Sequence, residues 1–101
     1  MLSLSKRPTA IFAASDTQAI GVLEAARASG LRVPEDVSVV GYDDIEMADV
    51  LDLTTVRQLL FESGQRGVEL LLEALEKPHV EPVHEVLPTE VIVRGTTAPP
   101  A

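Results

Sequence analysis

Short apolar runs alternate along the chain with stretches in which apolar residues recur every three or four positions. The runs are typical of strands buried on both faces of a sheet, and the periodic stretches are typical of helices that cover it. Strands are expected at 9–14, 37–42 and 53–57, with shorter candidates at 85–87 and 90–93. Helices are expected at 17–29, 45–51 and 60–76. This alternation predicts an α/β fold with a mostly parallel sheet flanked by helices.

Local signals support the boundaries of two of these helices. Ser15, with Gln18 three residues later, matches a capping box, and Gly30 has the position of a C-terminal glycine. From Leu60 onward the apolar side chains form one stripe of a strongly amphipathic helix, which Pro78 ends. The tail after residue 94 is expected to be irregular and exposed.

Polar residues follow three of the expected strands. They are Ser15 and Asp16, then Tyr42, Asp43 and Asp44, then Arg57 and Gln58. Ligands of open α/β sheets bind beyond the carboxyl ends of the strands, so these side chains are expected around one mouth. Hydroxyl, carboxylate and amide groups in such a mouth suit a neutral ligand that is rich in hydroxyls.

Several of the candidate residues also have a structural explanation that needs no ligand. Ser15 can serve only as a helix cap, and Asp16 can be a first-turn acid favoured by the helix dipole. Asp43 or Asp44 can cap the short helix expected near residue 45. Spacing alone favours capping for Ser15 and leaves the role of Asp43 open.

Composition narrows the classes of function. The net charge of −8, from 16 acidic and 8 basic residues, opposes direct binding of nucleic acid by these residues. The absence of cysteine removes disulfides, thiolate catalysis and cysteine-ligated zinc. No apolar run approaches the roughly 20 residues of a membrane helix, so no membrane partner is expected. The 46% of hydrophobic residues is high for so short a chain, which indicates either strands buried on both faces or apolar surface meant for a partner.

Enzyme and metal chemistry are less well supported. Asp16, Asp43 and Asp44 could hold Mg²⁺ in a receiver-like phosphoacceptor domain, but neither a following lysine nor a glycine-rich phosphate loop accompanies them. His79 and His84 lack the further ligands that a metal site needs. No serine or threonine has a histidine placed near it in the sequence for a hydrolase triad. The chain is therefore expected to be neither an enzyme nor a cofactor protein.

Several stretches together resemble one known family. Residues 30–44 read GLRVPEDVSVVGYDD, residues 53–58 read LTTVRQ, and 8–16 with 19–21 resemble its PTAIFAxxDxxAxG stretch. Segments 87–90 and 93–97 resemble the ending of the same family, which is the LacI/GalR transcription repressors. The likeness covers nearly the whole chain in order. It implies a partial periplasmic-binding-protein-like fold, the C-terminal fragment of an effector-binding domain.

The resemblance also implies how the chain is organised. Residues 1–58 would belong to one subdomain, 59–88 would cross to the other, and 89–101 would form a return strand and tail, with the helix-turn-helix domain absent. Asp43 falls at the family's effector-binding aspartate, and Ser15 falls where many members have an asparagine or serine that contacts the ligand. Gln58 lies near the ligand at the crossover, and Asp16 completes the expected ligand-binding set.

The function that the resemblance implies is sensing of a small-molecule effector, expected to be a sugar, in a cytoplasmic repressor. The family dimerises through surfaces that match 17–29 and 47–53, although the two prolines that often precede LTTV are absent here. Operator DNA would be bound only through the missing N-terminal domain. Because a fragment leaves its apolar helix stripe uncovered, self-association is expected. The alternative function is a fragment of a periplasmic sugar-binding transport protein. The sequence names neither the sugar nor the operator.

Overall fold

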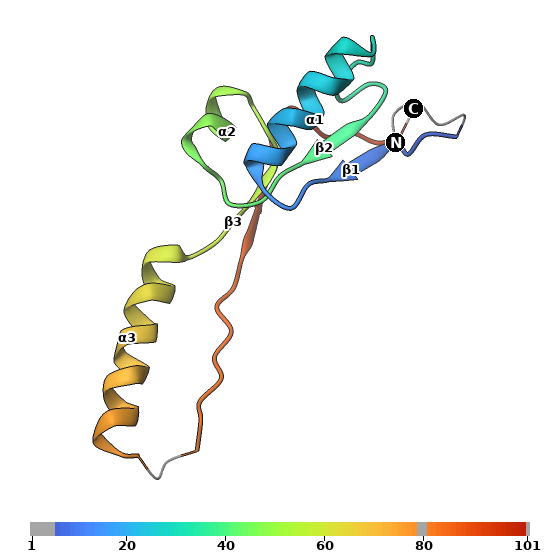
Figure 1. Cartoon of the computed structure of the whole chain (residues 1–101). Coiled ribbons are helices and arrows are strands. Elements are labelled where there is room, and N and C mark those ends of the chain that lie inside the picture. Colours follow the sequence, from blue (N-terminus) through green and yellow to red (C-terminus); the bar gives the residue numbers. More distant parts are fainter. Residues whose placement is uncertain (1–5, 79–80, 101) are drawn as a thin grey trace. The chain divides into compact units, whose positions relative to one another are not determined.

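The structure is a computed structural model that describes residues 6–78 and 81–100. The chain divides into two compact units, Met1–Arg57 with Glu90–Ala101 and Gln58–Thr89. Its elements, shown in Figure 1, are β1 (Ala10–Phe12), α1 (Asp16–Ala28), β2 (Ser38–Val40), α2 (Glu46–Val50), β3 (Thr55–Arg57), α3 (Leu60–Glu76) and β4 (Glu90–Ile92). In the described part of the chain, no helix combines the length and apolarity needed to cross a bilayer.

The first unit is built on short strands. β1 and β2 pair in parallel, with Ile11 opposite Val39, and a parallel bridge joins Val40 to Thr54 just before β3. β4 pairs with β3 in the antiparallel sense. The predicted α/β class with a partial, mostly parallel sheet is confirmed, and the return strand is the antiparallel exception.

α1 covers this sheet with small side chains. It buries Ala19 and Ala26 completely, and Figure 1 shows it running along β1 and β2. At its start, the amide of Gln18 donates to Oγ of Ser15 at 3.2 Å, which confirms the predicted cap. The core that α1 closes comprises Ala13, Ala19, Val39, Ala48 and Leu53, with Val22, Leu23 and Val33 packed against it.

The C-terminal tail is not wholly exposed, which corrects the expectation from the sequence. The hydroxyl of Thr96 accepts from the amide of Thr54 at 2.9 Å and donates to the carbonyl of Val39 at 2.7 Å. The carbonyl of Thr96 accepts from the amide of Val39 at 2.9 Å. The tail is held because the backbone groups of buried Val39 and Thr54 need partners, which Thr96 supplies.

The second unit contains α3 and the extended segment that follows it. Arg66 on α3 forms a bidentate ion pair with Glu85, in which Nε donates at 2.8 Å and Nη2 donates at 2.7 Å. The expected strand at 85–87 does not form. Glu85 is held by this ion pair, and Pro88 has no N–H to offer a ladder.

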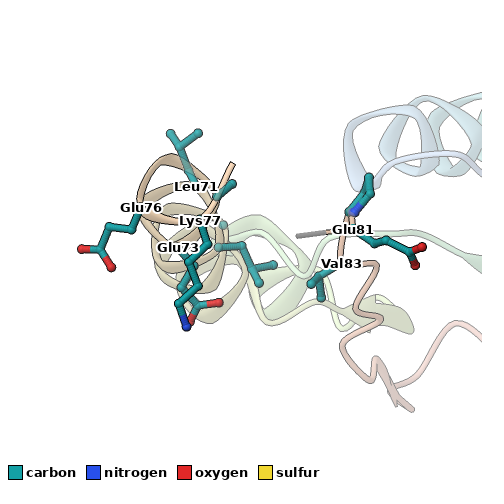
Figure 2. Close-up of a pocket in the computed structure, with 10 residues that line it drawn as sticks. Leu71, Glu73, Glu76, Lys77, Glu81 and Val83 are labelled. Atoms are coloured by element: carbon teal, nitrogen blue, oxygen red, sulfur yellow. The ribbon is translucent and has the colours of Figure 1, made fainter. Parts of the chain in front are cut away.

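The apolar stripe of α3 is uncovered. None of the α3 residues is buried, and Leu60, Phe61, Val68, Leu71, Leu72 and Leu75 are all more than half exposed. A cleft of about 680 Å³ opens between α3 and residues 81–83. Figure 2 shows Val83 facing the helix, whereas the carboxylates of Glu76 and Glu81 point away. We interpret the cleft as incompletely packed apolar surface rather than a polar ligand site.

This exposure predicts that the 101-residue chain self-associates. Sedimentation velocity over a range of concentrations should show a concentration-dependent dimer or larger species, because pairing buries the α3 stripe. Leu72→Lys, in the stripe, should shift the population toward monomer, and Glu76→Lys, on the same helix, should not. A compact monomer at every concentration would contradict the prediction.

Candidate ligand-binding site

The loop after β2 has a demanding backbone conformation. Asp43 has φ +116° and Asp44 has φ +57°, in the region that residues with a side chain rarely adopt. The amide of Asp43 donates to the carbonyl of Val56 at 2.9 Å, and the ring of Tyr42 lies 6.5 Å from that of Phe12. Conformations of this kind persist only where surrounding contacts impose them, and they cluster at ligand-binding sites.

Asp16 is the principal support of this loop. Its carboxylate accepts from the hydroxyl of Thr55 at 2.5 Å and from the amide of Ile45 at 2.8 Å. Its own amide donates to the carbonyl of Tyr42 at 2.9 Å. Because Asp16 has no exposed surface, direct contact with a ligand is not available to it in this conformation. In this structure Asp16 holds the loop at both ends and ties it to β3.

Gly41 makes room for the buried carboxylate. A Cβ atom at this position would overlap Oδ1 of Asp16 and lie 3.2 Å from its Cα. Gly41 donates its amide to the carbonyl of Thr54, so its own position is fixed. Glycine at 41 is needed for the close approach of Asp16 to the backbone of the loop.

Thr55 links the two ends of the network. Its buried hydroxyl donates to Asp16 and accepts from the amide of Asp44 at 3.3 Å, so both functions of the hydroxyl are used. Thr55 was not among the residues predicted for the ligand-binding site. The sequence feature that could have pointed to Thr55 is a hydroxyl residue within an expected buried strand, because a buried hydroxyl needs a hydrogen-bond partner.

Asp44 forms ion pairs with two arginines, Arg57 and Arg94. Burial alone would raise the pKa of the Asp44 carboxyl, but the hydrogen bonds from Arg57 and then Arg94 outweigh burial and hold that pKa below its usual value. Arg94, like Thr55, was not among the residues predicted for the site. The sequence feature that could have pointed to Arg94 is a single arginine directly after an apolar run.

The four predicted ligand residues are divided between the two units. Ser15 and Asp43 belong to the first unit and are each partly exposed, at the ends of β1 and β2 that parallel pairing brings together. The oxygen of Ser15 caps α1, and its proton can still be donated to another acceptor. Gln58 is the first residue of the second unit and is also partly exposed.

The geometry does not favour the Mg²⁺ alternative. Both carboxylate oxygens of Asp16 accept protein hydrogen bonds, and both of those of Asp44 face arginines, which a cation would have to displace. Among the described residues, no three His, Cys, Asp or Glu side chains form a group suited to a metal ion. His79, one of the two histidines considered, lies outside the described residues.

Comparison with known proteins places the chain in a family of ligand-binding folds. Residues 1–97 match the periplasmic binding protein-like domain, and the chain belongs to this family. It is 39% identical to the HTH-type transcriptional repressor CytR of Escherichia coli K12 over 99 residues, which are 96% of this chain and 29% of CytR. It is 42% identical to PurR of Vibrio campbellii over 97 residues, 93% of this chain and 29% of PurR.

Solved structures of LacI-type regulators are similar to this chain in fold and sequence. A ribose-bound LacI family regulator from Enterococcus faecium has a TM-score of 0.79 at 36% identity, covering 94% of this chain and 36% of that one. The dimeric Lac repressor has a TM-score of 0.80 at 40% identity, covering 93% and 35%. The resemblance to LacI-type repressors and the fold class are thus confirmed. The curated relatives are repressors rather than enzymes, and the chain spans about three-tenths of their length.

Replacing Gly41 by alanine should destabilise the chain by about 1–3 kcal/mol, because the new methyl group overlaps the Asp16 carboxylate. Urea unfolding measures the change. Gly21→Ala is the matched control, because its Cβ meets nothing within 4 Å and α1 should gain about 0.5–1 kcal/mol from the better helix former. Equal stability of the two variants would refute the tight approach at Gly41.

Thr55→Val keeps the shape of the side chain but removes the hydroxyl that Asp16 and the amide of Asp44 share. The free energy of unfolding should fall by about 1–3 kcal/mol, since buried polar groups lose their partner. Thr55→Ser keeps the hydroxyl and should lose less. If valine proves as stable as threonine in the same unfolding measurement, the network does not hold the loop.

Proposed function

We propose that this chain is the effector-sensing and dimerising part of a LacI-type transcription repressor, and that its effector is a sugar. The observation that carries the proposal is the Asp43 loop, held at positive φ by buried Asp16 where β1 and β2 end side by side. The sequence relatives support the repressor over the transport-protein alternative.

The chemistry of the partly exposed residues supports a ligand rich in hydroxyls. The carboxylate of Asp43 can accept from two neighbouring hydroxyls, and the amide of Gln58 can both donate and accept. Ser15 adds a hydroxyl proton that capping does not use. Structural relatives hold ribose or, in the regulator CelR, cellobiose. In this proposal Asp16 belongs to the site as the support of Asp43.

The predicted ligand residues fall in both units of the chain. Ser15 and Asp43 lie in the unit of 1–57 and 90–101, and Gln58 opens the unit of 58–89. These boundaries support the proposed organisation, in which residues 1–58 belong to one subdomain, residues 59–88 cross to the other, and residues 89–101 return.

The proposed partners are a second copy of the protein and operator DNA. Met47, Val50 and Leu51 are exposed on and beside α2, in the segment proposed for dimerisation with 17–29. A dimeric Lac repressor among the structural relatives supports this assembly. With a net charge of −8, the chain would depend on a separate N-terminal domain for contact with DNA, and the repressor would act in the cytoplasm.

Asp43→Asn should weaken sugar binding in the whole protein that carries this chain. Loss of charge-assisted hydrogen bonds to the sugar should raise the Kd about 10- to 100-fold. Titration calorimetry with ribose and with cellobiose measures it. Glu46→Gln removes an equal charge from an exposed position nearby and should leave the Kd unchanged. Unaltered binding by Asp43→Asn, or equal loss in both variants, would rule out Asp43 as the effector-binding aspartate.

A further inference from the structure

Asp44 holds one arginine with each carboxylate oxygen. Oδ2 accepts from Nε of Arg57 at 2.7 Å, and Oδ1 accepts from Nη2 of Arg94 at 2.9 Å. The side chains of Asp44 and Arg94 are only 11% and 13% exposed, whereas that of Arg57 is 49% exposed. Arg94 also donates from Nη1 to the carbonyl of Leu53 at 3.0 Å. We call these three residues, Arg57, Asp44 and Arg94, the arginine clamp.

The arginine clamp lies where the chain passes between its two units. Arg57 is the last residue before the chain leaves the first unit, and Glu90 is the first residue after it returns. These two residues are partners in the β3–β4 ladder. Arg94 follows β4 by two positions. Asp44 is therefore bonded to β3 and to the segment that directly follows β4, and these two strands carry the chain out of the first unit and back into it.

The same loop is fastened to β3 along its length. The amide of Asp43 donates to the carbonyl of Val56, and that of Asp44 donates to the hydroxyl of Thr55. With Arg57, all three residues of β3 contact Asp43 or Asp44. A displacement of the Asp43 backbone would therefore also move β3, because the hydrogen bonds between the loop and the strand transmit the displacement.

We propose that Asp44 is a positioning residue that couples the loop of Asp43 to both connections between the units. It acts through Arg57 and Arg94 rather than by touching the effector. The inference rests on the proposed function for the part that concerns the effector. The fixing of the connections by the arginine clamp does not depend on a ligand.

The test measures distances between the units in the whole protein. Spin labels at Ala25→Cys on α1 and Glu62→Cys on α3, both exposed positions, report the distance distribution by pulsed electron resonance. Asp44→Asn leaves a neutral side chain of the same shape, which no longer attracts two cations. Asp36→Asn is the matched control, because it removes an aspartate–arginine pair with Arg32 away from this loop.

Without ligand, the distribution should be broader in Asp44→Asn than in the unsubstituted protein or in Asp36→Asn. With saturating ribose or cellobiose, the shift in mean distance should fall by about half or more in Asp44→Asn while the Kd changes less than in Asp43→Asn. Thermal unfolding checks that each variant is folded. Should Asp44→Asn not fold, Arg57→Gln removes the half-exposed arm alone and should broaden the distribution in the same direction.

The two proposals fail in different ways. A distribution in the folded Asp44 or Arg57 variant that matches the Asp36→Asn control, with or without sugar, overturns the coupling role. Failure of the unsubstituted protein to bind either sugar counts against the proposed function, and the ligand-free distributions still decide whether the arginine clamp fixes the connections.

Discussion

The carboxylate of Asp16 lies wholly inside the first unit, and the arrangement of the candidate site depends on how it is satisfied. A buried charge is expensive unless it is hydrogen-bonded. Its two donors, the hydroxyl of Thr55 and the amide of Ile45, are both neutral. Compensation also comes from its place in the first turn of α1, where the helix dipole favours negative charge. The burial can be sustained only while α1, the 43–45 loop and β3 keep their mutual positions.

This dependence explains why two consecutive aspartates adopt positive φ. The energetic cost of the positive φ angles at Asp43 and Asp44 is offset by hydrogen bonds to each residue of β3 and by the hydrogen bond from Ile45 to Asp16. Acid should release part of this restraint. The pKa of Asp44 is lower in the folded state, so its stabilising contribution is present above the ordinary aspartate pKa and is lost as pH falls through the folded value.

Two helices and the sheet edge that carries the site could be predicted, because the sequence patterns that indicate them are local. The apolar period gave α1 and α3 to within a residue, and Ser15 with Gln18 marked a real cap. Roles that depend on distant partners were not predictable. The bond from Thr55 to Asp16 spans 39 residues of sequence, and the tail at Thr96, which was expected to be exposed, bonds to Val39, 57 residues away. Hydropathy carries no information about such pairings.

The two units differ in what stabilises them. The first encloses a core and a satisfied polar network, whereas none of the described residues of the second is buried. An isolated helix the length of α3 is marginal in water, so its amphipathic pattern indicates that packing on the apolar stripe normally supplies its stability. In the proposed repressor, that packing would come from a second copy of the chain or from the rest of the effector-binding domain. The position of Gln58 would then depend on this packing against α3, whereas Asp43 is already held by contacts within the first unit.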